Sequence, residues 1–213
     1  KFVGGGSRTY VRAILKDLKI AGPPGEPPRS IRREGGGVVL DFGADRRRFD
    51  HVVIGCHADE ALALLEDADP REQRNLRPWR YQKNEVILHT DTRLLPPRRS
   101  DWASWNFLRA PGSGDSRAVS VSYYMNRLQR LKTEADYIVT LNPHAPIDPA
   151  KVIDRTCMTH PLYSFESMAT QTPIDAKNGA RNTWFCGSYL GYGFHEDAVR
   201  SAVRIAAKFG ISL

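Results

Sequence analysis

The sequence predicts a mixed α/β fold (α+β mixed), with a mixed sheet and helices in the middle of the chain and strand-and-helix segments at both ends. Near both ends, apolar residues recur at helical spacing directly after glycine-containing turns. Between residues 85 and 141, short apolar runs are separated by loops rich in proline and glycine. With 41% hydrophobic residues among 213, the chain can fill one large core or parts of two.

The N-terminal third is expected to mix helices with strands. A helix over residues 8–18 has Ser7 as a candidate N-cap, and four prolines and two glycines in residues 21–28 predict an irregular linker. The run Arg46-Arg47-Arg48 is expected in a solvated hairpin turn. The other elements are strands over 30–33, 38–42 and 51–55 and short helices over 58–65 and 70–76.

The middle third is expected to be rich in strands, and the chain is expected to end on a helix. The predicted elements are strands over 85–90, 103–108, 118–124 and 137–141, a short helix over 125–131, a helix or turn near 149–155, and a last strand over 184–186.

The segment that follows the last strand is the most informative. The strand stops at Gly187, and a loop leads into a helix with acids in its first turn and apolar residues at 199, 202, 203 and 206. Glycine lets a ligand approach the backbone closely, and a helix start offers free N–H groups and a positive dipole end. This segment therefore predicts a site for an oxygen-rich, electron-rich ligand near residues 195–198.

These residues also carry a family resemblance. The motifs Phe185–Ser188 and Gly193–Ala198 resemble the C-terminal flavin signature of the flavin-containing amine oxidase superfamily. Lys1–Ser7 resembles its internal glycine-rich segment, and Phe49–Cys56 resembles the strand that follows. Five motifs resemble a narrower bacterial group of NAD/FAD-binding oxidoreductases, whose plant relatives are fused to cyclopropane fatty-acyl synthases: Tyr81–Asn84, Leu88–Asp91, Trp102–Asn106, Tyr124–Gln129 and Thr140–Pro143.

The resemblance implies a domain organisation. Residues 1–56 and 180–213 are expected to be pieces of a flavin-binding domain of the glutathione-reductase type, and 57–179 a piece of the substrate domain. The G-x-G-x-x-G turn is absent, and the chain begins at Lys1 within a motif that belongs in the middle of such proteins. We therefore expect the C-terminal half of a longer FAD-dependent oxidoreductase. Without its N-terminal dinucleotide-binding half, this fragment is expected to be inactive, to retain no FAD and to self-associate.

The cofactor-binding residues that the resemblance implies lie in three short segments: Gly4, Gly5 and Ser7; Gly187 and Ser188; and Phe194, His195 and Glu196. The second segment matches positions where the backbone approaches the flavin pyrophosphate. The third matches the helix start that faces the pyrimidine edge of the isoalloxazine, where negative charge develops on reduction. A strand-ending turn and ordinary helix caps are the alternative explanations.

The candidate catalytic residues are Asn84, His89 and Tyr124, which lie in the narrower motifs. His89 is equally well explained as a structural histidine. Many amine oxidases place a lysine on a substrate-domain strand, where this sequence has an apolar residue, about Val86. This departure, with the plant fusions, favours hydride transfer from an acyl chain or another lipid, or from another small molecule, over amine oxidation. The competing interpretation is a non-catalytic module that binds lipid or a protein partner.

Composition limits the partners and the compartment. The net charge of +7 comes from scattered arginines, so no nucleic acid is expected. No apolar run approaches the roughly 18 residues of a membrane span, so no transmembrane segment is expected. The three cysteines, Cys56, Cys157 and Cys186, are expected to be buried and unpaired, which favours the cytoplasm. No set of residues has metal-ligand spacing, so no metal is expected.

Overall fold

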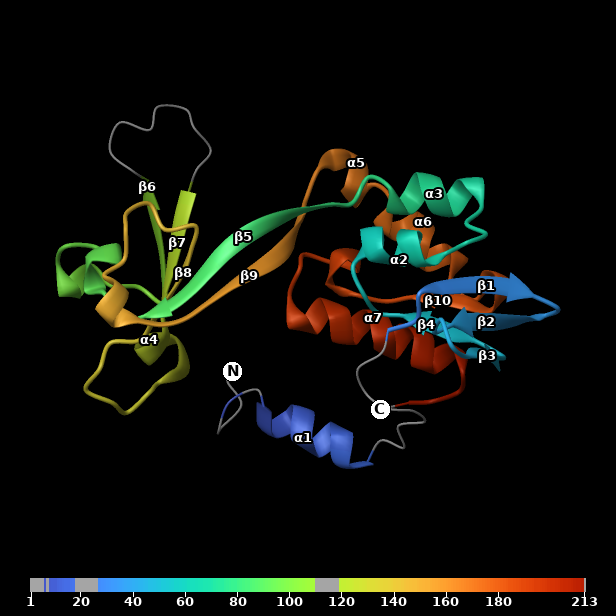
Figure 1. Ribbon diagram of the computed structural model, residues 1–213, viewed down its shortest axis with the longest axis horizontal. Helices are drawn as coiled ribbons and strands as arrows, with labels where there is room; N and C mark the ends of the chain where they lie inside the picture. Colours follow the sequence, from blue (N-terminus) through green and yellow to red (C-terminus); the bar gives the residue numbers. More distant parts are fainter. Residues whose placement is uncertain (1–5, 7, 18–26, 110–118, 213) are drawn as a thin grey trace. The chain divides into compact units, whose positions relative to one another are not determined.

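The computed structural model describes residues 6, 8–17, 27–109 and 119–212 (Figure 1). Their contacts define two compact units. The sheet unit comprises residues 83–160, with helix α1 (Arg8–Asp17) assigned to it, and the flanking unit comprises residues 27–82 and 161–212. The units divide near residues 82 and 160, because the helices after residue 57 and before residue 179 pack into the same hydrophobic core as strands β1 (Ser30–Glu34), β4 (Val52–Ile54) and β10 (Thr183–Phe185). The division into flavin-domain and substrate-domain pieces at residues 56 and 179 stays a prediction. The predicted mixed α/β class is confirmed.

The flanking unit contains two small sheets. Three strands form an antiparallel sheet in chain order: β1 (Ser30–Glu34), β2 (Gly37–Asp41) and β3 (Arg46–Phe49). The prediction of a turn at Arg46–Arg48 was wrong, because these residues form β3. Arg46 pairs with Asp41 on β2, and Arg48 donates to the Gly35 carbonyl, so the arginines are held along the sheet by ionic and backbone partners. The second sheet pairs β4 (Val52–Ile54) with β10 (Thr183–Phe185) in parallel.

Helices complete the core of the flanking unit. They are α2 (Ala58–Leu64), α3 (Pro70–Leu76), α5 (Phe165–Met168), α6 (Gln171–Lys177) and α7 (His195–Lys208), with 3-10 turns η4 (Ala180–Asn182) and η5 (Ser188–Leu190). Trp79 lies at the centre of the core, where its ring contacts the edges of Tyr163 and Tyr189. Its indole N–H donates to Thr170, so a large apolar side chain is buried without an unsatisfied donor.

The sheet unit is built on a five-stranded sheet with the order β6-β7-β8-β5-β9. The strands are β5 (Arg80–His89), β6 (Trp105–Arg109), β7 (Val119–Tyr124), β8 (Ile138–Leu141) and β9 (Val152–Leu162), joined in part by α4 (Met125–Gln129) and the 3-10 turns η1 (Thr92–Leu94), η2 (Arg99–Asp101) and η3 (Pro149–Lys151). The sequence pattern did not predict strand β9. Most of its residues are exposed at the sheet edge, so it lacks the alternation of buried and polar residues that marks a strand.

Three further observations concern surface and burial. The cysteines are not buried as expected: Cys157 is exposed on β9, and Cys56 and Cys186 are half-buried. The apolar residues of α1, among them Tyr10 and Ile14, are exposed. Within the described ranges, none of the helices combines the length and the apolar character that crossing a membrane requires.

Candidate functional site

The predicted ligand-facing segment forms a strand, a tight turn and a helix, as expected. Gly187 follows β10 with φ 155° and ψ 166°, a conformation that L side chains rarely adopt. A Cβ atom at Gly187 would lie 2.7 Å from the ring of the buried Tyr189. The Gly187 N–H donates to Ser201 Oγ at 2.9 Å. Glycine is therefore required here by the core. Contact of Gly187 with the flavin pyrophosphate stays a prediction. The Gly187 N–H is bonded to Ser201, so it does not offer a free donor for that contact.

The loop after the turn is held by a buried carboxylate. Asp197 Oδ2 accepts hydrogen bonds from the N–H groups of Tyr192 and Phe194, each at 3.0 Å. The Gly191 backbone lies so close to this carboxylate that a Cβ atom at Gly191 would be 2.4 Å from Asp197 Cγ. Asp197, in the first turn of α7, therefore fixes the path by which the chain enters the helix.

The buried face of α7 differs from the predicted one. Asp197, Ser201 and Ile205 are buried, whereas the apolar pattern pointed to residues 199, 202, 203 and 206. Val199 is exposed. Asp197 and Ser201 lie on the buried face because they accept hydrogen bonds from backbone N–H groups of the preceding loop. Their spacing of four residues, continued by Ile205, was the sequence signal that could have revealed this face.

The start of α7 leaves two backbone donors free. The N–H of Asp197 bonds to the Phe194 carbonyl, but those of His195 and Glu196 have no acceptor within the described chain. Both residues and Phe194 are exposed. Ser188 is half-buried, and its carbonyl accepts from the N–H groups of Gly191 and Gly193. A helix start with two exposed N–H groups favours negative charge, and this donor set fits the pyrimidine edge of a flavin.

The third predicted cofactor segment, Gly4, Gly5 and Ser7, lies outside the residues that the structure describes.

His89 lies in the interior of the sheet unit with both ring nitrogens engaged. Its Nε2 is 2.8 Å from Thr140 Oγ1, and its Nδ1 accepts from the Asp91 N–H at 3.1 Å. Nδ1 as an acceptor makes the neutral ring carry its proton on Nε2. Burial lowers the pKa of His89, which also favours this neutral form. The geometry supports the structural explanation of His89 over a catalytic one.

We expect the stability contributed by His89 to depend on pH. Because its pKa is lower in the folded chain than in the unfolded chain, its contribution is complete above about pH 6.5 and declines as the pH falls through the folded pKa. Replacing His89 with Gln is expected to lower the free energy of unfolding by about 1 kcal/mol at pH 7 and to flatten its pH dependence between about pH 7 and 5. Urea denaturation at several pH values measures both effects. The exposed His195→Gln is the control, and an unchanged pH profile in His89→Gln would contradict the structural role.

The other two catalytic candidates are also tied into hydrogen-bond networks. Asn84 is buried, with Nδ2 2.9 Å from His160 Nδ1 and Oδ1 accepting from Asn142 at 2.7 Å. Tyr124 donates its hydroxyl to Asp136 Oδ1 at 2.6 Å. Burial and this carboxylate raise the pKa of Tyr124. Tyr124 therefore keeps its phenol proton, which it directs to Asp136.

The sheet places two of these candidates in register. His89 on β5 and Tyr124 on β7 both lie opposite Ile138 of the intervening β8. They therefore lie at the same level, about 10 Å apart at two strand spacings. Val86, about where amine oxidases place a lysine, is buried on β5 opposite Leu141. Sequence reasoning missed Asp136, which is bound by both Tyr124 and Arg99.

A helix start with exposed N–H groups, placed after a parallel strand pair and a tight turn, is suited to an anionic or oxygen-rich ligand. The chain matches the model of the flavin-containing amine oxidoreductases over residues 4–208, and it belongs to this family. No curated protein matches it in sequence.

Three similar solved structures share this fold. A CLA-producing fatty acid isomerase from P. acnes is 15% identical, with a TM-score of 0.66, and the alignment covers 97% of this chain and 52% of that one. Reduced UDP-galactopyranose mutase is 12% identical, with a TM-score of 0.64 and coverage of 98% and 52%. Wild-type putrescine oxidase bound to putrescine is 12% identical, with a TM-score of 0.65 and coverage of 96% and 53%. The chain thus spans about half the length of each, and the likeness concerns the fold alone.

Proposed function

We propose that this chain is part of an FAD-dependent oxidoreductase that moves a hydride from a carbon atom of an acyl chain or another lipid to the flavin. The observation that carries the proposal is the start of α7, where the N–H groups of His195 and Glu196 are exposed and free in a member of a flavin-containing family. When bound, a flavin supplies the hydride acceptor. The protein supplies binding, orientation and electrostatic stabilisation.

The residues of this chain have separate roles in the proposal. The N–H groups of His195 and Glu196 would hold the pyrimidine edge and stabilise the negative charge that gathers there. Asp197 and Ser201 would act as positioning residues, because they fix the loop and the turn by hydrogen bonds to the backbone. The adenine dinucleotide part would need donors from a dinucleotide-binding half, so we propose that residues 1–213 alone retain no FAD.

The substrate class follows from what the sheet unit offers. Val86 is apolar and buried, Tyr124 is held protonated, and His89 is held neutral with both nitrogens bonded. These residues offer neither a cation to hold a water nor a free base to take the proton of an ammonium group, and they favour an apolar substrate. The fatty acid isomerase among the similar structures supports a lipid, and its identity and TM-score are slightly higher than those of putrescine oxidase.

Anaerobic reduction of the bound flavin tests the substrate class. The complete protein, with its dinucleotide-binding half, is mixed with fatty-acyl compounds and alkylamines of matched chain length, and the flavin absorbance is followed. We expect reduction by the acyl series, with affinity that rises with length because each buried methylene contributes about 0.8 kcal/mol.

Two outcomes separate the parts of this proposal. Efficient reduction by the amines and none by the acyl compounds would contradict the lipid substrate while leaving the flavin assignment intact. A complete protein that purifies without flavin and does not bind added FAD would contradict the oxidoreductase itself, and it would favour the non-catalytic binding module.

A further inference from the structure

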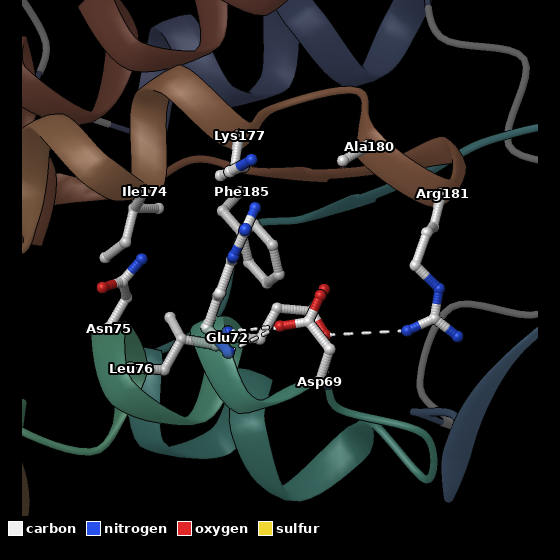
Figure 2. Close-up of a pocket in the computed structure, with 10 residues that line it drawn as sticks. Asp69, Glu72, Asn75, Leu76, Ile174, Lys177, Ala180, Arg181 and Phe185 are labelled. Atoms are coloured by element: carbon white, nitrogen blue, oxygen red, sulfur yellow. Dashed lines mark hydrogen bonds and ion pairs between the residues drawn. The ribbon is translucent and has the colours of Figure 1, made fainter.

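The flanking unit contains a pocket that the proposed oxidoreductase does not use. It has a volume of about 230 Å³ and lies between α3 and α6 (Figure 2). Its residues Ala180 and Arg181 precede β10, whereas the candidate flavin residues follow that strand. Its volume is below the range of about 300–1,000 Å³ that is usual for drug-sized ligands, so it suits a small molecule.

The floor of this pocket is apolar. Leu76 of α3, Ile174 of α6 and Phe185 of β10 line it, and all three side chains also belong to the hydrophobic core. Figure 2 shows Leu76 and Asn75 on α3 facing Ile174 and Lys177 on α6, with Phe185 between the two helices. Because these residues are anchored in the core, the floor is fixed before any ligand binds, and burying a hydrocarbon segment against it is favourable.

The acidic residues of the wall are already engaged within the fold. Both carboxylate oxygens of Glu72 accept from the Arg33 guanidinium, at 2.7 and 2.8 Å, and one also accepts from the Asp69 N–H. Asp69 caps α3 by accepting from the N–H groups of Arg71 and Glu72. These backbone N–H bonds lower the pKa of Asp69, so it stays ionised. The wall therefore keeps its negative charge but has few lone pairs left for a ligand.

Two cations at the pocket have no partner among the described residues. The guanidinium of Arg71 on α3 and the ammonium of Lys177, the last residue of α6, make no hydrogen bond or ion pair within the part of the chain that the structure describes. Arg181, by contrast, is paired with Asp67. The charged groups still available to a ligand are therefore positive, one on each of the two helices.

We propose that this pocket binds a small amphiphilic monoanion, a medium-chain carboxylate, with its head at Arg71 and Lys177 and its alkyl chain on the floor of Leu76, Ile174 and Phe185. A guanidinium donates to both oxygens of a carboxylate, and an ammonium adds a point charge. A dianion such as a phosphate monoester is disfavoured, because the carboxyl groups of Asp69 and Glu72 lie in the wall. This site is independent of the proposed flavin chemistry.

Calorimetric titration of the full chain with sodium octanoate tests the proposal. Octanoate is expected to bind, and octanol and octyl phosphate to bind at least tenfold more weakly. Arg71→Gln and Lys177→Gln are each expected to weaken octanoate binding by about tenfold, which corresponds to about 1.4 kcal/mol. Arg74→Gln, an exposed arginine on the same helix that does not line the pocket, is the matched control. Ala180→Phe is expected to abolish binding by filling the pocket, and thermal unfolding of each variant verifies that it is folded.

Several results would overturn the proposal. These are no binding of octanoate at millimolar concentration, equal binding of octanol, tighter binding of octyl phosphate, or octanoate binding that Arg71→Gln and Lys177→Gln leave unchanged.

Discussion

Replacing Arg33 with Met is expected to lower the free energy of unfolding by about 3–5 kcal/mol, because it leaves two carboxylates without their buried partner. The Arg33 side chain is only 3% exposed. It donates to Asp67 Oδ1 at 2.8 Å, to the Asp67 carbonyl at 2.9 Å and to both oxygens of Glu72. This single guanidinium joins β1 to the start of α3, so its loss affects the centre of the flanking unit.

Urea denaturation of Arg33→Met and Arg32→Met measures this difference. Arg32 is the adjacent residue on the same strand, but its side chain is 60% exposed and has one acidic partner, Glu66. Exposed pairs of this kind contribute about 0–1 kcal/mol, so Arg32→Met should be nearly neutral. Equal losses in the two variants would show that the buried network does not stabilise the unit.

Replacing His195 with Pro is expected to weaken binding of the reduced flavin by about tenfold to a hundredfold in the complete protein, because a hydrogen bond to a charged group contributes about 1.5–3 kcal/mol. Among the backbone groups, proline removes only the N–H of residue 195. This is the first residue of α7, so no intrahelical hydrogen bond is lost. The preceding Phe194, at φ −88° and ψ 158°, already has the extended conformation that a residue before proline prefers. His195→Ala removes the side chain and keeps the N–H, so it is the matched control and is expected to bind as the native protein does.

The sequence predicted the elements whose pattern is local. The strands expected over 30–33 and 38–42 lie where β1 and β2 form, and the short helix expected over 70–76 coincides with α3. The position of the strand, turn and helix at residues 183–208 was predicted equally well. Each of these signals depends on neighbouring residues, so a single sequence contains all that is needed.

What the sequence did not predict depends on contacts between distant residues. The arginine run became β3 because Asp41 and the Gly35 carbonyl bind it from across the sheet. Glycine at 187 looked like a ligand-facing residue, but the ring of Tyr189 and the hydroxyl of Ser201 determine its conformation. His89 could be read equally as a base or as a structural residue until Thr140, 51 residues away, was seen to bind its second nitrogen. The cofactor segment at Gly4, Gly5 and Ser7 stays a prediction.

The central claim is that the backbone at the start of α7 holds the flavin, and a flavin titration of two variants tests it most directly. FAD is added to the flavin-free complete protein, and to its His195→Pro and His195→Ala variants, while the quenching of flavin fluorescence is followed in the oxidised state and the absorbance in the reduced state. We expect His195→Ala to match the native protein and His195→Pro to bind more weakly, with the larger loss in the reduced state. Equal affinities in all three proteins, or a loss in His195→Ala as large as in His195→Pro, would contradict it.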